Sequence, residues 1–165
     1  MKVSPELDSL DSVGYLYLRE LSEPRDNSLR LVVDEAISNL SGSVRADQLH
    51  PAELAEMLKD AQAIETTDSC KRFELTWKQY IAYLVTEECV GSCGNYNDEI
   101  FSGKVFRVYT KSHFLDHLVR DTGGHSEAIR HYKLTCLNHL IDVAAYAPAV
   151  IRLVRTASST PIRIQ

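Results

Sequence analysis

The hydrophobic pattern near the N-terminus predicts a β-hairpin. Residues 13–20 form a run rich in Leu and Tyr, side chains that suit a half-buried strand. Residues 22–27 (SEPRDN) are typical of a turn. Hydrophobic and polar residues then alternate over residues 29–37, which is the period of a second strand. Because two strand patterns joined by a short turn favour antiparallel pairing, we expect a hairpin here.

The middle of the chain is predicted to contain a short helix and then a long strand. Residues 41–43 (SGS) indicate a loop, and Pro51 suits the first turn of a helix. Apolar residues recur at helical spacing up to Ala61, which predicts a short amphipathic helix at the edge of the domain. Strand-forming residues dominate residues 70–90, where we expect one long strand with a bend or bulge near Lys78.

The region after residue 90 predicts a strand followed by the main helix. Residues 91–103 are turn-rich, and residues 104–109 have the pattern of a strand. Ser112 is a good N-cap for the following helix, which is expected to end at Gly123-Gly124. We expect one apolar stripe of this helix to pack on a sheet, formed by Phe114, Leu115, Leu118 and Val119.

The last part of the chain predicts a second pair of strands. The two strands span residues 131–137 and 140–146, with a turn at Asn138-His139. Pro148 is then expected to open a short helix over residues 149–154.

These segments together predict a single α+β domain over residues 1–155. We expect a curved, mainly antiparallel sheet of about six strands, one principal packed helix (residues 112–121) and short peripheral helices. Residues 156–165 are polar and contain Pro161, so they are expected to form a flexible tail.

Composition and charge narrow the classes of function. No run approaches the roughly 18 apolar residues of a membrane span, and the N-terminus lacks an apolar signal core, so we expect a cytoplasmic protein without membrane contact. Residues 1–69 contain 14 Asp and Glu against 6 Lys and Arg, whereas residues 70–165 contain 9 against 12. An acidic half argues against nucleic acid as a ligand, because that binding needs clustered basic residues. It is compatible with a basic protein partner, and equally with a surface that only keeps the protein soluble.

The cysteines and histidines do not predict a metal site or a cofactor. Four cysteines in such a chain favour reduced thiols. Cys89, Cys93, Cys136 and His139 are suitable zinc ligands in type, but positions 136 and 139 of a regular strand face opposite sides. His113 and His117 are one helical turn apart, yet they lack a third ligand and fit a solvated helix face.

Two groups of residues remain as candidate sites. The preferred one is the loop that contains Tyr96, Asp98 and Glu99, where an aromatic side chain and two acids could contact a basic protein. The alternative is a polar site for a small enzyme or a metal-dependent small-molecule binder, formed by His131, Cys136, His139 and Asp142. No nucleophile elbow, Walker loop or dinucleotide fingerprint is present, so we assign no catalytic residue and expect a non-catalytic protein-binding module.

Three segments support a resemblance to a group of known proteins. They are FELTWKQYIAYLVTEE (residues 73–88), GKVFRVYTKSHFLDHL (residues 103–118) and RHYKLTCLNHLIDVAA (residues 130–145). These segments resemble small uncharacterised bacterial cytoplasmic α+β proteins, and the likeness covers residues 29–154. Some similar small acidic proteins serve as immunity proteins against secreted toxins. The resemblance therefore implies an immunity or regulatory protein that blocks a partner, and it implies no catalytic residue.

Overall fold

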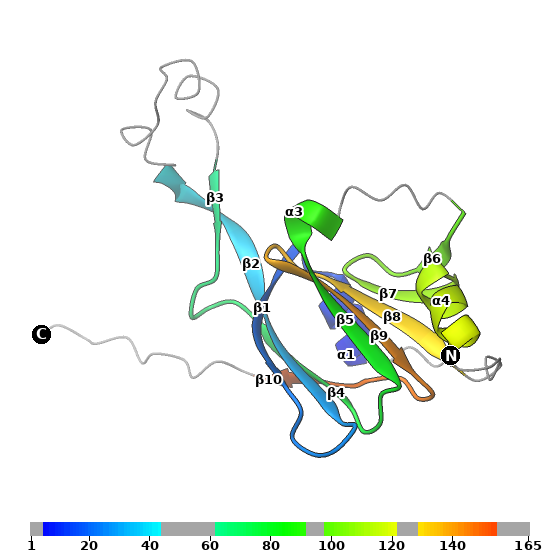
Figure 1. Ribbon diagram of the computed structural model, residues 1–165. Helices are drawn as coiled ribbons and strands as arrows, with labels where there is room; N and C mark the ends of the chain where they lie inside the picture. Colours follow the sequence, from blue (N-terminus) through cyan, green and yellow to red (C-terminus); the bar gives the residue numbers. More distant parts are fainter. Residues whose placement is uncertain (1–4, 44–61, 92–97, 122–128, 155–165) are drawn as a thin grey trace, which may run out of the picture.

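Two antiparallel sheets facing each other form the body of the protein (Figure 1). This computed structural model describes residues 5–43, 62–91, 98–121 and 129–154. The first sheet has the order β1-β2-β4-β10, and β3 also pairs with β2. Its strands are β1 (Tyr15–Ser22), β2 (Leu29–Ser43), β3 (Gln62–Glu65), β4 (Arg72–Trp77) and β10 (Val150–Val154).

The second sheet has the order β5-β9-β8-β7-β6. Its strands are β5 (Ala82–Glu87), β6 (Ile100–Ser102), β7 (Phe106–Lys111), β8 (Arg130–Thr135) and β9 (His139–Ala145). Three helices complete the described residues: α1 (Pro5–Asp11), α3 (Glu88–Gly91) and α4 (His113–Asp121). None of the helices in these ranges is long and apolar enough to cross a membrane.

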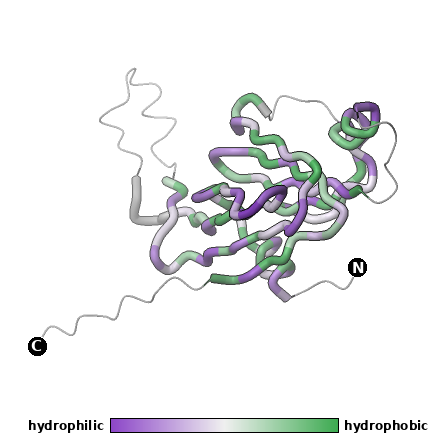
Figure 2. The backbone as a smooth tube through the Cα atoms, turned by 60° about the horizontal axis from the view of Figure 1, so that its bottom comes forward, coloured by the Kyte–Doolittle hydropathy of each residue, from purple (hydrophilic) through white to green (hydrophobic). Residues whose placement is uncertain are grey.

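The hydrophobic core lies between the two sheets. Hydrophobic and hydrophilic residues are interspersed along the strands (Figure 2), and in β4 buried and half-buried side chains alternate, so this strand turns one face toward the core. Trp77 of the first sheet contacts Phe106 and Tyr132 of the second, with ring centroids 6.4 Å and 5.9 Å away. Leu10 of α1 is also fully buried in this core. The fold is therefore predominantly β.

The two predicted hairpins are confirmed. β1 pairs with β2, and β8 pairs with β9, both antiparallel. The turn of the second hairpin also joins the two sheets at one corner. Asn138 accepts a hydrogen bond from the backbone N–H of Leu18 and donates one to its carbonyl, at 2.9 Å and 3.0 Å. The side chain of Asn138 thus extends the strand pairing of β1.

The expectation of one long strand over residues 70–90 is wrong, although the bend is where it was predicted. β4 pairs with β2 in the first sheet, whereas β5 pairs with β9 in the second. The backbone N–H of Tyr80 donates to Asn27 of the first hairpin, and the next N–H, of Ile81, donates to Ala144 of the second sheet. The chain changes sheets at this point because each half finds its hydrogen-bonding partner in a different sheet.

Two other local expectations are also wrong. Residues 149–154 do not form a helix, because β10 occupies this segment and pairs with β4. Residues 41–43 belong to the long strand β2 instead of a loop. The expected helix after Pro51, the Gly123-Gly124 helix stop and the tail at 156–165 lie outside the described residues.

The expected principal packed helix is only partly correct. Ser112 is the N-cap of α4, since its Oγ accepts the backbone N–H of Leu115 at 3.1 Å. However, α4 has no buried residue, and its predicted core stripe is only half-buried. The reason is that the two sheets already enclose the core between them, so α4 lies at the outer side of the second sheet next to β8 (Figure 1).

Candidate binding pocket

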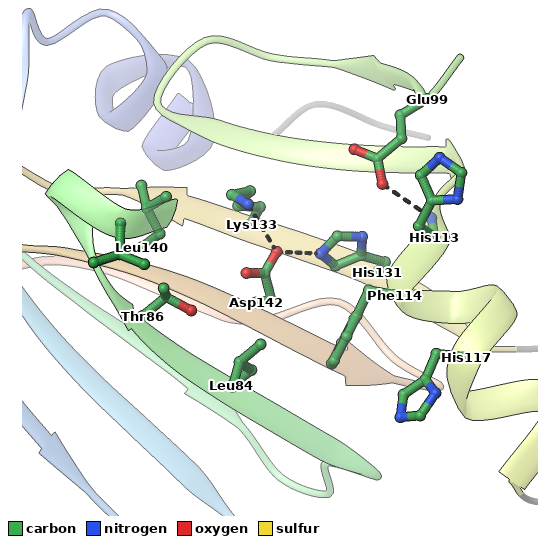
Figure 3. Close-up of a pocket in the computed structure, with 11 residues that line it drawn as sticks. Leu84, Thr86, Glu99, His113, Phe114, His117, His131, Lys133, Leu140 and Asp142 are labelled. Atoms are coloured by element: carbon green, nitrogen blue, oxygen red, sulfur yellow. Dashed lines mark hydrogen bonds and ion pairs between the residues drawn. The ribbon is translucent and has the colours of Figure 1, made fainter. Parts of the chain in front are cut away.

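The outer face of the second sheet carries a row of polar side chains. Tyr132 and Leu134 of β8 point into the core, so the alternating residues His131 and Lys133 point to the opposite face. Lys133 lies directly across from Asp142 of β9 in the strand register. Asp142 Oδ1 is 2.8 Å from His131 Nε2 and 3.3 Å from Lys133 Nζ (Figure 3).

His131 is held on every side. Its side chain is only 2% exposed, and its ring stacks on Tyr109 with centroids 4.2 Å apart. The Phe114 ring packs against it from α4 at 5.0 Å. Its Nδ1 lies 2.7 Å from Ser112 Oγ, the same oxygen that caps α4. The ring therefore joins the start of α4 to the sheet.

The hydrogen-bond partners define the arrangement of protons in the neutral ring. Nε2 faces the carboxylate of Asp142, so Nε2 carries the proton and donates it. Nδ1 is then an acceptor, and the Ser112 hydroxyl donates to it while accepting from Leu115. Ser112 and His131 are both buried, and Ser112 Oγ also caps α4. This set of Ser, His and Asp thus favours a positioning role, because nucleophilic or acid–base catalysis needs an accessible group.

A pocket of about 400 Å³ opens beside this row. Lys133 and Asp142 contribute its polar floor, with side chains 19% and 9% exposed. Its apolar lining consists of Leu84, Val90, Phe114 and Leu140, and its edge toward α4 consists of Glu99, His113 and His117 (Figure 3). An apolar wall that faces convergent polar groups is a feature of small-molecule sites.

The polar floor keeps unused hydrogen-bonding capacity. Within the described ranges, Asp142 Oδ1 contacts His131 Nε2 in a hydrogen bond and Lys133 Nζ in an ion pair, whereas Oδ2 has no hydrogen-bond partner. The ammonium of Lys133 has three N–H groups, and the contact with Asp142 uses one of them. A ligand could therefore donate to Asp142 and accept from Lys133 at the same place.

The predicted partner-binding acids hold the start of α4. Glu99 Oε1 accepts the backbone N–H of His113 at 2.9 Å. Asp98 contacts Lys111 Nζ at 3.0 Å and His113 Nε2 at 2.7 Å. These hydrogen bonds, first that of Lys111, lower the pKa of Asp98 to about 2. Both acids line or adjoin the edge of the pocket, whereas Tyr96 lies outside the described residues.

The alternative polar site is only partly assembled. The structure brings His131 and Asp142 together, but it places Cys136 in the core at the turn of the β8–β9 hairpin. Burial there raises the pKa of the Cys136 thiol to about 12, which makes it a poor nucleophile. His139 is linked to Cys136 only through the backbone, where the N–H of Cys136 donates to the carbonyl of His139 at 2.9 Å.

The four side chains that are suitable zinc ligands in type can be assessed only where the chain is described. Within those ranges, no three His, Cys, Asp or Glu side chains converge on a common point. Cys89 is exposed and Cys136 is buried, while Cys93 lies outside the described residues. The charge of Glu87 raises the pKa of the Cys89 thiol, which disfavours the thiolate that a metal requires.

Sequence reasoning missed Lys133 and Leu84, and it recognised Ser112 only as a helix cap. A signal for Lys133 was present, because residues two apart on a strand share a face and His131 was already a candidate. No local signal could place Leu84, which reaches the pocket through the pairing of β5 with β9. No known protein family, characterised protein or solved structure shows a significant match to this chain, so the geometry of the pocket is the basis for assigning a function.

Proposed function

We propose that this protein binds a small polar molecule in the pocket on the outer face of the second sheet, without converting it. The observation that carries the proposal is the convergence of Lys133 and Asp142 on the pocket floor, each with unused hydrogen-bonding capacity. Leu84 and Leu140 beside them offer apolar surface to the same ligand. The volume of about 400 Å³ lies within the range of small-molecule sites.

The network behind the pocket supports binding rather than turnover. His131 is the nearest candidate for a general base, but its ring is buried between Ser112 and Asp142 and is only 2% exposed. Its role is to hold Asp142 in one orientation, as second-layer hydrogen bonds do in preorganised binding sites. Rigid polar groups reduce the entropy that a ligand must offset on binding.

The proposal is tested by thermal unfolding of the protein in the presence of a collection of small polar compounds. A ligand at 100 times its Kd should stabilise the folded state by about 2.7 kcal/mol and raise the Tm. Lys133→Met keeps most of the side-chain stem and removes the ammonium, so it should abolish the increase. Lys78→Met is the matched control, because Lys78 is an exposed lysine in the connection between β4 and β5.

Compounds that raise the Tm of Lys133→Met as much as that of the wild type would place binding elsewhere and contradict the proposal. Conversion of a bound compound to a product, lost in His131→Ala, would favour the enzyme instead.

A second candidate function, protein binding, is supported by one feature of the surface. Asp98 and Glu99 lead directly into β6, an edge strand whose Ile100 and Phe101 are exposed. Exposed apolar residues on a sheet edge are typical of contacts with another protein. An immunity or regulatory protein of the kind that the sequence resembles would use such a surface to block its partner.

The protein-binding candidate predicts an effect that the pocket does not. An immunity protein is expected to be encoded beside its partner, so the product of the neighbouring gene is the protein to test. Ile100→Asp should weaken that association at least tenfold, whereas Lys133→Met should not change it. Association that is unaffected by Ile100→Asp and by the pair Asp98→Lys with Glu99→Lys would exclude this surface.

A further inference from the structure

We propose that the ligand of this pocket is a neutral molecule of about one ring in size that carries adjacent hydroxyl groups. This inference rests on the proposed binding function and adds the chemical class of the ligand. Three observations carry it: the charge balance of the pocket floor, the hydrogen-bonding groups left unused there, and the apolar wall that faces them.

The charges on the pocket floor cancel each other. Lys133 Nζ lies 3.3 Å from Asp142 Oδ1, so an anion placed against the ammonium also lies close to the carboxylate. A cation placed against Asp142 meets the ammonium of Lys133 in the same way. In both cases attraction and repulsion largely offset each other, while the ligand still loses the hydration of its charge. A neutral polar group loses far less on leaving water.

The edge of the pocket carries mostly paired side chains and one acid, Glu99. Glu99 uses one carboxylate oxygen on the backbone N–H of His113. The neighbouring Asp98 is compensated by Lys111 and His113. His117 lies next to Asp121 at 3.5 Å, and His131 contacts Asp142 from behind the floor. The edge therefore adds the acidic charge of Glu99 to the pocket, while the charges of the floor itself remain paired.

The unused groups on the floor match hydroxyl groups. Asp142 Oδ2 requires a donor, and the remaining N–H groups of Lys133 require an acceptor. A hydroxyl group supplies both functions, and two hydroxyls on neighbouring carbons can meet the two side chains together. Hydrogen bonds to charged groups are stronger than those between neutral groups, so this pair gives a neutral ligand its orientation.

The wall of the pocket matches the carbon face of a ring. Leu84 and Val90 are 49% and 65% exposed although they line the hollow, so a ligand that covers them removes apolar surface from water. A cavity of about 150 Å³ accommodates benzene. The present pocket of about 400 Å³ therefore holds one substituted ring with room for water at its edge.

The test compares four probes that share a cyclohexane ring and differ in charge. They are cis-1,2-cyclohexanediol, cyclohexanecarboxylate, cyclohexylammonium and the zwitterion 1-aminocyclohexanecarboxylate. The readout is the NMR shift of the Leu84 and Leu140 methyl groups in the full chain, with the methyl groups of Leu153 in β10 as an internal control. We expect the diol to bind in the millimolar range, as suits about eight non-hydrogen atoms, and at least fivefold more tightly than each charged probe.

Two variants should reverse the preference in opposite directions. Asp142→Asn keeps an oxygen for His131 but leaves the charge of Lys133 uncompensated, so cyclohexanecarboxylate should become the tightest probe. Lys133→Met leaves the charge of Asp142 uncompensated, so cyclohexylammonium should become the tightest. A protein that has only lost its fold would lose all probes together, so a reversal is specific to the pocket. Lys78→Met should retain the order of the wild type.

The outcomes separate the ligand class from the binding function. If a charged or zwitterionic probe binds the wild type more tightly than the diol at the Leu84 methyls, the neutral class is wrong and the binding function remains. If none of the four probes shifts Leu84 or Leu140 at 100 mM, or if Leu153 shifts equally, both the ligand class and the pocket as a binding site are overturned.

Discussion

The outer faces of the two sheets both carry buried charge, but they use it differently. On the first sheet, Asp34 accepts three hydrogen bonds from two arginines, at 2.6 Å and 3.0 Å from Arg72 and at 3.1 Å from Arg19. Both of its carboxylate oxygens are therefore occupied. Beside it, Arg30 bridges Glu20 and Glu74 at 2.6 Å and 2.8 Å. These groups satisfy one another across neighbouring strands.

On the second sheet, the row of polar side chains leaves some of its hydrogen-bonding groups without a protein partner among the described residues. Asp142 uses one oxygen for both His131 and Lys133, and the remaining oxygen and N–H groups face a pocket. The comparison teaches that buried charge alone does not mark a site, because a complete network stabilises the fold and offers nothing to a ligand. The marker is a rigid network with capacity left over, next to a hollow.

The largest expected effect on stability follows from a substitution that breaks the network behind the pocket. His131→Ala removes a fully packed ring and leaves Ser112 and Asp142 without their partner. We expect the free energy of unfolding to fall by about 3–4 kcal/mol in a denaturant titration. His117→Ala on the exposed face of α4 is the control and should change it by less than about 0.5 kcal/mol. A loss below about 1 kcal/mol for His131→Ala would show that this network does not hold α4 to the sheet.

The next largest effect on stability is expected when the centre of the network on the first sheet is removed. Asp34→Ala leaves Arg72 and Arg19 without their shared acceptor, although both can turn toward water. We expect a loss of about 2–3 kcal/mol in the same titration, because hydrogen bonds to charged groups are lost. Binding of cis-1,2-cyclohexanediol should be unchanged, since the two faces lie on opposite sides of the core. If Asp34→Ala also lost binding of the diol, the two faces would not act independently, and the distinction drawn between them would be wrong.

A smaller effect concerns the dependence of stability on pH. Burial alone would raise the pKa of Asp34, but the hydrogen bonds from Arg72 and Arg19 outweigh it and hold the pKa below its ordinary value. Because the folded-state pKa is depressed, the unfolded chain binds the proton more readily. The stabilisation is present above the unfolded pKa near 4 and is lost as the pH falls through the folded pKa.

Asp34→Asn should therefore give a shallower decline in unfolding free energy between pH 5 and pH 3 than the wild type. Unfolding titrations across this pH range measure the difference. Equal slopes in the two proteins would mean that Asp34 does not contribute to acid sensitivity, and that other carboxylates such as Asp98 dominate it.

The smallest effect is expected on α4 itself. Leu118 is only half-buried, so Leu118→Ala should lower the free energy of unfolding by less than about 1 kcal/mol. Leu134 in the core between the sheets is the matched comparison, and Leu134→Ala should lower it by about 2–5 kcal/mol. Equal losses at the two positions in a denaturant titration would show that α4 is packed as firmly as the core, as the sequence pattern had indicated.

Several features of the fold were predictable because they depend on neighbouring residues. The two hairpins follow from alternation and turn residues, and Ser112 caps α4 as its position indicated. The change of direction near Lys78 was predictable as a bend. That the bend separates two sheets was not, because the sequence does not say which distant strand each half pairs with.

The residues predicted for the candidate site also fall into two groups, those that the structure brings together and those that it separates. The sequence predicts His131 and Asp142 as site residues, and the structure brings them into contact. It predicts Cys136 and His139 as members of the same site, but Cys136 lies in the core and His139 lies at the hairpin turn. Periodicity does not distinguish these cases, since a residue's place along a strand does not define which strand lies across from it.

The sequence by itself determined the local elements: most of the strands, their inward and outward faces, and the capped start of α4. These depend on backbone geometry and on side chains within one or two turns of the chain. Only the tertiary structure decided that residues 150–154 complete the first sheet as β10, and that α4 remains outside the core. It also decided that Lys133 faces Asp142 over a pocket. The physical reason is that strand pairing and register are selected by the burial of a whole core, and this free energy is shared between segments far apart in the chain.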